Sequence, residues 1–486
     1  MAEDIFHRNK SISPVEMSDM SKKPVEGDKR EENKSRLWSF LKSNEEHLKK
    51  FFETSLITSF PKIAASSSWK KRIWKSLIFV LCFVGLLCQT CTFLQFYFTY
   101  PTTVNLKFSS PYEIVQPALT LCSNNLISRP VYCEKSHAKC EFQGDEQLFC
   151  SQYPKYCGPG GNVSYKGVPT ERDFQTAKLN NSWEEADALA PKHGMIQECK
   201  KVINGQDIQC NIRRFPFVTK KRKATFCYTI DSLLGQPHAK DDIYPNTLYF
   251  SVELNTFPED YFSHSEPVFI YAVIHDRKHL VNPFLDGFIL NGGYRYMSYV
   301  SMTEIIRLPY PYNTNCTDYI KLWRENNGTG PLDEMTCIEH CKLNKLKAKN
   351  DCIDEYISYS PHQEELCAFG IEKTNSDIVK DCGMECQPAC QEQTYEVKYD
   401  EIEPDDDPCN SEDEYCKTSH IYLRVSFRKF RLTSHIYQPQ YKSVELFSYV
   451  GGYMGMWLGL SLVSVCDFVE SICLLIYHPV IKRIKK

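Results

Sequence analysis

Residues 446–466 read LFSYVGGYMGMWLGLSLVSVC, an uncharged run of 21 residues. Three glycines recur in it at every fourth position, Gly451, Gly455 and Gly459. Residues four apart lie on one face of a helix, so several copies of this segment could approach closely around an axis. Ordinary packing of small residues between two membrane helices is the alternative, and the glycines alone favour neither interpretation.

Two carboxylates follow this run. Asp467 and Glu470 stand among apolar residues that continue to Tyr477, and four basic residues lie beyond it at 482–486. A charged side chain inside a membrane span is costly unless it faces water or a partner. We therefore expect Asp467 and Glu470 to line a hydrated passage and to attract cations.

A second apolar run lies nearer the N-terminus. Residues 77–98, LIFVLCFVGLLCQTCTFLQFYF, would reach roughly 33 Å as a helix, enough to cross a hydrocarbon core of about 30 Å. A long, mostly polar segment comes before it, which is not typical of a cleavable signal peptide. Basic residues at 70–75 flank this run on its N-terminal side, and the end of the chain is basic as well. The positive-inside rule therefore places both termini in the cytosol.

This topology predicts five parts. They are a cytosolic N-terminus, disordered in part (1–72), a first transmembrane helix (73–99), an extracellular domain (100–443), a second transmembrane helix with the pore (444–477) and a short cytosolic tail (478–486). The mean hydropathy of −0.41 leaves room for only a few such spans.

Cysteine content and sequons agree with a large extracellular domain. The chain has 23 cysteines in 486 residues, a proportion typical of an oxidising compartment. Five of them lie in the two apolar runs, and the remaining 18 are an even number that could pair completely. Four N-x-Ser/Thr sequons of this domain are candidate glycosylation sites: Asn162, Asn180, Asn315 and Asn327. Asn9 and Asn33 head two more on the expected cytosolic side.

Hydrophobic periodicity predicts a mixed α/β extracellular domain. Strands are expected at 247–254, 268–275 and 421–430, helical structure over 332–358, and a loop-rich, cysteine-dense segment between 122 and about 206. A net charge of −4 indicates no basic nucleic-acid surface, and no catalytic triad, phosphate loop or zinc motif is readable, so neither an enzyme nor a cofactor is expected.

Several motifs resemble the epithelial sodium channel, degenerin and acid-sensing ion channel superfamily. The segment from Gly451-Gly452 to Gly459-Leu460-Ser461 is similar to its Gly-Gly-x-x-Gly-x-x-x-Gly-x-Ser signature. Gln116-Pro-Ala-Leu-Thr-Leu-Cys122 resembles its Phe-Pro-Ala-Val-Thr-x-Cys strand, with Gln116 in place of Phe. Further similar segments are Cys227-Tyr-Thr-Ile-Asp-Ser, Ile274-His275-Asp276, Leu308-Pro-Tyr-Pro-Tyr312 and Cys386-Gln-Pro-Ala-Cys390.

The resemblance implies roles for individual residues. Gly459, Leu460 and Ser461 would form the selectivity filter, and Gly451 and Gly455 would line the pore with the two carboxylates. Ser448 would hold a gating position that needs a small side chain, and Tyr100 and Tyr312 would form an aromatic gating contact. An ordinary surface serine and two unrelated tyrosines are the alternatives. Tyr449 replaces an aspartate of acid-sensing members, and residues 56–61 lack the His-Gly of the family.

The resemblance also implies disulfide pairings. These are Cys122–Cys227, Cys199–Cys210, Cys316–Cys390, Cys337–Cys386, Cys341–Cys382, Cys352–Cys367 and Cys409–Cys416. Cys133, Cys140, Cys150 and Cys157 are left with three possible pairings. A metal site formed by Cys382, Cys386 and Cys390 is the alternative to the disulfides of these three cysteines. Ten acidic residues between 396 and 414 are interpreted as a solvated tip or, alternatively, a proton or divalent-ion sensor.

Together with the two spans, the resemblance implies a plasma-membrane cation channel subunit that conducts Na⁺ and is sensitive to amiloride. Its partners would be the lipid bilayer and related subunits in a homo- or heterotrimer, which the resemblance implies. Two alternatives remain. One is an ATP-gated purinergic-type channel, which lacks the Gly-x-Ser signature, and the other is a non-conducting, double-anchored receptor.

Overall fold

The computed structural model describes residues 68–140, 144–157, 168–170, 172–174, 182–220, 223–349, 351–354, 357–367, 371–402, 414–461, 463–466, 469–470 and 473. They divide into two compact units. The helical unit contains the described residues up to Tyr97 and from Tyr441 onward, and the disulfide-rich unit is Phe98–Gln440.

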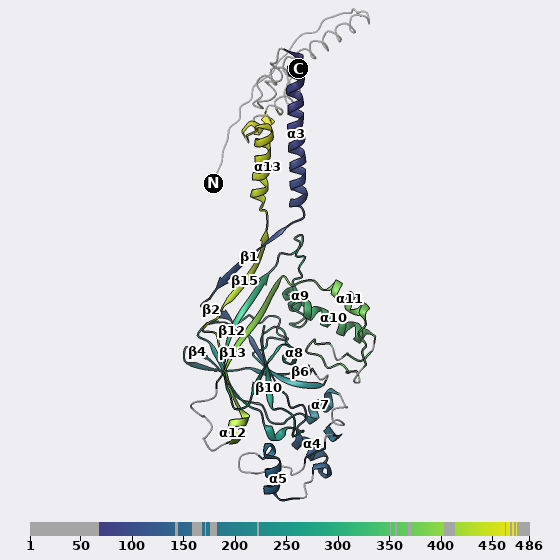
Figure 1. Cartoon of the computed structure of the whole chain (residues 1–486), viewed down its shortest axis with the longest axis vertical. Coiled ribbons are helices and arrows are strands. Elements are labelled where there is room, and N and C mark those ends of the chain that lie inside the picture. The colour runs from purple at the N-terminus through teal and green to yellow at the C-terminus, as the bar shows by residue number, and fades with distance from the viewer. Residues whose placement is uncertain are drawn as a thin grey trace, which may run out of the picture. The chain divides into compact units, whose positions relative to one another are not determined.

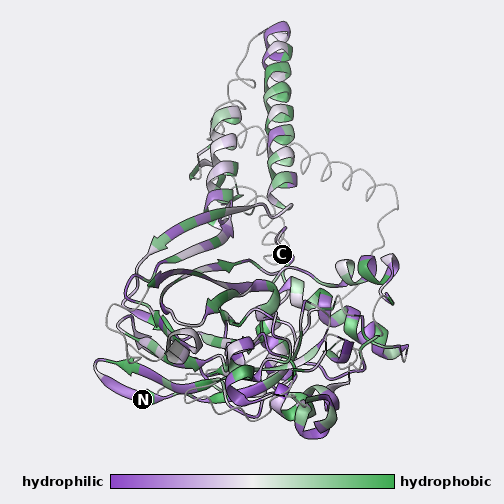
Figure 2. Ribbon diagram, turned by 60° about the horizontal axis from the view of Figure 1, so that its bottom comes forward, coloured by the Kyte–Doolittle hydropathy of each residue, from purple (hydrophilic) through white to green (hydrophobic). Residues whose placement is uncertain are grey.

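The helical unit consists mainly of α3 (Trp69–Tyr97) and α13 (Ser443–Leu458), which pack against each other (Figure 1). Most residues of α3 are apolar, as Figure 2 shows, and Leu86 is the one that is buried. Within the described part of the chain, α3 is the helix whose length and composition would suit a membrane crossing. It begins four residues before the expected span 73–99, because the basic turn at its start is helical, and it ends two residues earlier. Tyr100 at φ 50° and Pro101, which cannot continue a helix, follow that end.

A large mixed sheet forms the centre of the disulfide-rich unit (Figure 1). Its order is β1 (Thr102–Ser109), β15 (Leu432–Pro439), β12 (Arg295–Ile306), β14 (His420–Ser426), β9 (Tyr249–Asn255), β4 (Ile196–Ile203) and β5 (Gln206–Gln209), with β13 (Gln391–Ile402) also paired to β12. Strand β12 runs parallel to β14 and β15 but antiparallel to β13.

A second sheet contributes the other side of the core. Its order is β11 (Phe288–Asn291), β10 (Phe269–His275), β3 (Ala118–Ser123), β7 (Ala224–Ile230) and β6 (Ile212–Val218). The short strands β2 (Glu113–Val115) and β8 (Ile243–Pro245) form a separate pair. Side chains of both large sheets, among them Leu121, Ile270, Phe250 and Val425, are buried together in one apolar cluster. The disulfide-rich unit is therefore mixed α/β, as expected.

Helices cover the sheets at two places. The first group is α9 (Tyr319–Glu325), α10 (Glu334–Ala348) and α11 (Ser376–Glu385), and the second is α4 (Arg129–Lys135), η1 (His137–Cys140), α5 (Glu146–Gln152), η2 (Pro154–Tyr156) and α7 (Trp183–Leu189). Three short elements complete the unit: η3 (Pro258–Asp260), α8 (Pro283–Asp286) and α12 (Glu414–Ser419). The segment expected to be loop-rich therefore contains several short helices.

Two predicted elements end earlier than expected. The strand expected at 421–430 stops at Ser426, because the chain turns so that both Phe427 and Phe430 enter the core. The helical structure expected over 332–358 stops at Ala348. Beyond it, Ile353 pairs with the segment near Leu366 and is buried without helical structure, since the Cys352–Cys367 bond holds these two segments together.

Candidate functional site

The helix α13 ends inside the apolar segment, at Gly459. This glycine has φ 65°, a left-handed conformation that glycine adopts without the steric cost of a side chain. Its N–H donates to the carbonyl of Gly455 at 3.0 Å, and the N–H of Leu460 donates to Met454 at 3.3 Å. This is a glycine cap of the kind that commonly ends helices. The expected second span, 444–477, is therefore not one continuous helix.

Ser461 starts the next helical segment. Its Oγ accepts the N–H of Ser464 at 3.1 Å and lies 2.9 Å from the Ser464 hydroxyl, while its carbonyl accepts from Val465. A serine in this position is a typical N-cap. Residues 463–466 and 469–470 are helical. Gly459, Leu460 and Ser461 thus form a short break between two helical stretches.

The break changes which backbone groups are available. At a helix end, carbonyl and N–H groups lose their partners in the same helix. Lipid chains cannot form hydrogen bonds with these groups. Non-helical backbone at membrane depth is therefore tolerated where it is buried in protein or lines a water-filled passage. Backbone carbonyls exposed to such a passage could replace part of the hydration shell of a cation.

The glycine face of α13 is open. A Cβ atom placed on Gly451 or Gly452 would meet nothing within 4 Å among the described residues, and one on Gly455 would lie 3.7 Å from the carbonyl oxygen of Leu460. Another helix could therefore approach this face closely. Glu470 lies in the helical segment after the break and is exposed, whereas Asp467 lies outside the described residues.

Ser448 and Tyr449 lie side by side in the sequence but make different contacts. The Ser448 hydroxyl donates to the carbonyl of Val444 at 3.0 Å, and the residue is exposed. The ring of Tyr449 lies 5.0 Å from Phe93 and 5.8 Å from Tyr441. Tyr449 therefore belongs to an aromatic cluster between α3 and α13, which the sequence analysis missed. The only signal was the spacing of Tyr449 and Tyr453, one helical turn apart.

The two predicted gating tyrosines lie together in the disulfide-rich unit. The Tyr100 and Tyr312 ring centroids are 5.7 Å apart, and the rings meet edge to face at 80°. This geometry is the favourable one for aromatic pairs. Tyr100 precedes β1 and Tyr312 follows β12, so the contact joins segments that are distant in the sequence.

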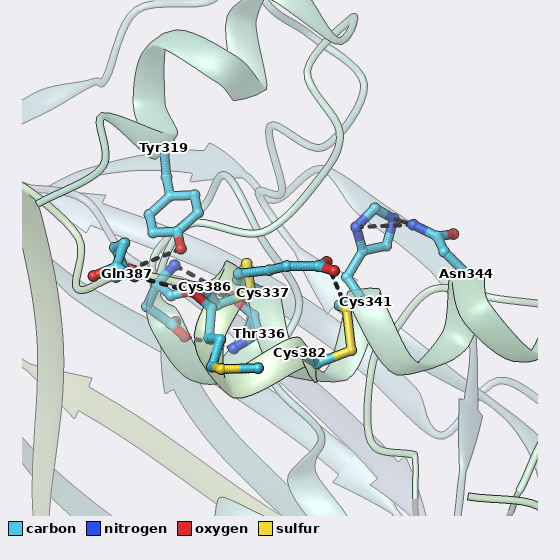
Figure 3. The surroundings of a disulfide bond; sticks show 12 residues. Tyr319, Thr336, Cys337, Cys341, Asn344, Cys382, Cys386 and Gln387 are labelled. Carbon is cyan, nitrogen blue, oxygen red and sulfur yellow. Dashed lines mark hydrogen bonds between the residues drawn. A yellow bond between two sulfur atoms is a disulfide. The ribbon is translucent and has the colours of Figure 1, made fainter. Parts of the chain in front are cut away.

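Eight disulfides connect the described cysteines of this unit. Six join the pairs that the family resemblance implied, and the four unassigned cysteines form Cys133–Cys140 and Cys150–Cys157. Two of the bonds, Cys337–Cys386 and Cys341–Cys382, tie α10 to α11 (Figure 3). Because Cys409 lies outside the described residues, the Cys409–Cys416 pairing stays a prediction.

The alternative metal site at Cys382, Cys386 and Cys390 is wrong. Each of these sulfurs is part of a disulfide and cannot act as a thiolate ligand. The five cysteines of the two apolar runs, in contrast, are free: Cys82, Cys88, Cys91, Cys466 and Cys473.

The structure also describes two of the candidate glycosylation sites, part of the acidic segment and His275. Asn315 and Asn327 are exposed, whereas Asn162 and Asn180 lie outside the described residues. Of the acidic segment, the residues up to 402 belong to β13, and 403–413 lie outside the described part. His275 is buried, its ring nitrogens lie 2.7 Å from the Thr120 hydroxyl and the Asp276 carbonyl oxygen, and burial lowers its pKa to about 4.

Comparisons with known proteins give a consistent result. A family model described as amiloride-sensitive sodium channel matches residues 51–471. Degenerin unc-8 of Caenorhabditis elegans is 22% identical over 270 residues, which is 48% of this chain and 34% of that protein. Degenerin mec-10 of Caenorhabditis briggsae is 25% identical over 251 residues, 46% of this chain and 34% of that protein. The aligned part spans about a third of the length of these curated relatives.

A solved structure of a proton-activated chloride channel aligns with 82% of this chain and 96% of that chain, at 6% identity and a TM-score of 0.25. A score this low supports no structural argument.

Proposed function

Because the chain belongs to the amiloride-sensitive sodium channel family, we propose that it is a degenerin-type subunit that conducts Na⁺ down its gradient. The observation that carries this proposal is the break at Gly459–Ser461 inside an apolar segment. Such a break exposes backbone polar groups where lipid cannot satisfy them, so it favours a hydrated passage at this position.

The second apolar segment is the proposed wall of the pore. Helix α13 has 16 residues and reaches about 24 Å, less than a hydrocarbon core of about 30 Å. We propose that α13 and the helical residues after Ser461 together complete the second span. The carbonyls of Gly459, Leu460 and Ser461 would then select the ion, and Asp467 and Glu470 would raise the local cation concentration on the inner side.

The assembly is proposed to be a trimer of identical or related subunits in the plasma membrane, with both termini in the cytosol. The open glycine face of α13, at Gly451 and Gly455, supports close approach of neighbouring copies. In this arrangement a small side chain at Ser448 keeps the closed state compact. The Tyr100–Tyr312 contact would transmit movement of the disulfide-rich unit to the segment that follows α3.

Voltage clamp of cells that express the full chain tests this proposal. External Na⁺ is replaced by K⁺ and then by a large organic cation, and amiloride is added at the end. We expect a Na⁺ current that amiloride reduces and that the organic cation cannot carry. Neutralising Asp467 and Glu470 together, to Asn and Gln, should lower the single-channel conductance. Unchanged conductance and selectivity in that variant would contradict the pore-lining role.

The same recordings separate the alternatives. A current that appears only on addition of ATP would favour the purinergic-type channel. A chain that reaches the cell surface and carries no cation current under acid, peptide or stretch would favour a non-conducting receptor.

A further inference from the structure

One polar contact joins α3 to α13 within the helical unit. The indole Nε1–H of Trp457 donates to the amide oxygen of Gln89 at 2.6 Å. Gln89 lies in the uncharged part of α3, where a hydrogen-bond partner lowers the cost of placing a polar side chain between two helices. Gln89 and Trp457 are both partly buried, as expected for a contact at a helix interface.

A glycine on α3 makes room for the same indole. A Cβ atom on Gly85 would lie 2.8 Å from two carbons of the Trp457 ring, closer than real Cβ contacts allow. Gly85 and Gln89 are four residues apart and therefore share one face of α3. The tryptophan is thus held in two ways, by a hydrogen bond from its ring nitrogen and by close packing of its ring against the α3 backbone.

The contact of Trp457 with α3 lies at the end of α13, next to the break at Gly459–Ser461. Trp457 lies in the last turn of the helix, two residues before Gly459. The capping bonds that end α13 come from Gly459 and Leu460, and they return to Gly455 and Met454 in the same turn. The backbone of Trp457 lies within the turn that these bonds close, so a contact that holds its ring against α3 also acts on the start of the break.

We propose that Gln89 and Gly85 are positioning residues for ion selectivity. They fix Trp457 against α3 and thereby set where α13 ends and how the carbonyls of the Gly459–Ser461 break are placed. This inference rests on the proposed channel function, and it assigns α3 a part in selectivity beyond that of a membrane anchor.

The test compares relative Na⁺ and K⁺ permeability, taken from reversal potentials, in the full chain and its variants. Gln89→Leu and Trp457→Phe each remove the hydrogen bond, and we expect each to change the permeability ratio roughly threefold, the typical effect of one hydrogen bond between membrane helices. Gln89→Asn keeps a neutral amide acceptor and should change the ratio less than Gln89→Leu does. Gln95→Leu is the matched control, because Gln95 is exposed on the same helix.

The double variant distinguishes a shared contact from two separate effects. If Gln89 and Trp457 act through one hydrogen bond, Gln89→Leu combined with Trp457→Phe should change the ratio no more than either single change. Gly85→Ala should change it in the same direction, because the new methyl group displaces the ring. Surface biotinylation of every variant checks that changes in the recordings do not come from lost expression.

The outcomes separate this inference from the proposed function. An unmodified channel that conducts Na⁺, with the same permeability ratio in Gln89→Leu and Trp457→Phe, would overturn the inference and leave the channel function intact. A shift of equal size in Gln95→Leu would also overturn it. Absence of any cation current from the unmodified chain would overturn the proposed function, and the inference with it.

Discussion

Lys201→Met should destabilise the disulfide-rich unit far more than the same change at its neighbour Lys200. The ammonium of Lys201 lies 3.0 Å from Oδ2 of Asp231, and the two side chains are only 8% and 4% exposed. The same carboxylate accepts the Gln116 amide at 2.6 Å and the N–H of Asn211 at 3.1 Å. Among the interactions that the structure describes, Lys201 is thus the charged side chain that pairs with this carboxylate, while the Arg277 guanidinium donates to the main-chain carbonyl of Asp231 at 2.7 Å.

The expected loss follows from what remains after the change. Methionine keeps most of the apolar stem of Lys201 but removes its charge, so the Asp231 carboxylate stays buried with neutral donors only. Removing one partner of a buried ion pair typically costs about 3–5 kcal/mol. At about 2 °C for each kcal/mol in a large domain, the thermal midpoint should fall by about 6–10 °C. Adding Asp231→Asn to Lys201→Met removes the unpaired charge and should restore much of this loss.

The midpoints are measured by heating the detergent-solubilised full chain to a series of temperatures and determining the folded fraction at each one by size-exclusion chromatography. Lys200 is the control, because it lies on the opposite face of β4 and pairs with Glu198 at the surface. Exposed pairs of this kind contribute little to stability, so Lys200→Met should leave the midpoint nearly unchanged. Equal shifts for the two lysine variants, or no recovery in the Lys201→Met/Asp231→Asn protein, would refute the reasoning.

Three further predictions concern other parts of the chain. Burial lowers the pKa of His362 to about 4, so the unfolded chain takes up a proton more readily than the folded one, and the free energy of unfolding should fall by up to about 3 kcal/mol between pH 6.5 and 4. His362→Leu should remove this part of the pH dependence. Identical curves of thermal midpoint against pH for the two proteins would contradict it. Asn327→Gln should increase gel mobility through loss of one glycan, whereas Asn33→Gln, on the expected cytosolic side, should not; equal shifts would disprove the topology. Ser448→Phe should raise the resting current by holding the pore open, and a silent, surface-expressed variant would argue against its gating role.

Much of the fold could be predicted where local pattern decides the structure. Apolar runs located β9 and β10 to within two residues: β9 alternates and buries one face, whereas β10 is apolar almost throughout and is buried along most of its length. The apolar pattern wrongly extended the last predicted strand beyond Ser426, because Phe427 and Phe430 are buried from a turn and not from a strand. The pairing of the four early cysteines depends on which come close in space, and counting alone allows three solutions.

The Gln116 position shows a limit of another kind. The resemblance expects phenylalanine there, and nothing local explains an amide in a buried strand end. Gln116 is 1% exposed, and its partner Asp231 lies 115 residues further along the chain. Asp231 itself is held by Lys201 from β4. A polar network built from three separate segments cannot be read from any one of them, so the departure is explained only by the folded structure.

The candidate pore combines a feature that sequence can predict with one that it cannot. A glycine cap followed by a serine cap would end one helix and start another in any protein, soluble or not. In this chain the break lies in an apolar segment, so its backbone polar groups need hydrogen-bond partners from other parts of the protein or from water. The sequence predicts the uncharged run, and the family resemblance points to Gly459 and Ser461, but the two caps are seen only in the structure. The contact of Trp457 with α3 depends on how two helices far apart in the chain pack together, and that contact determines where the break is held.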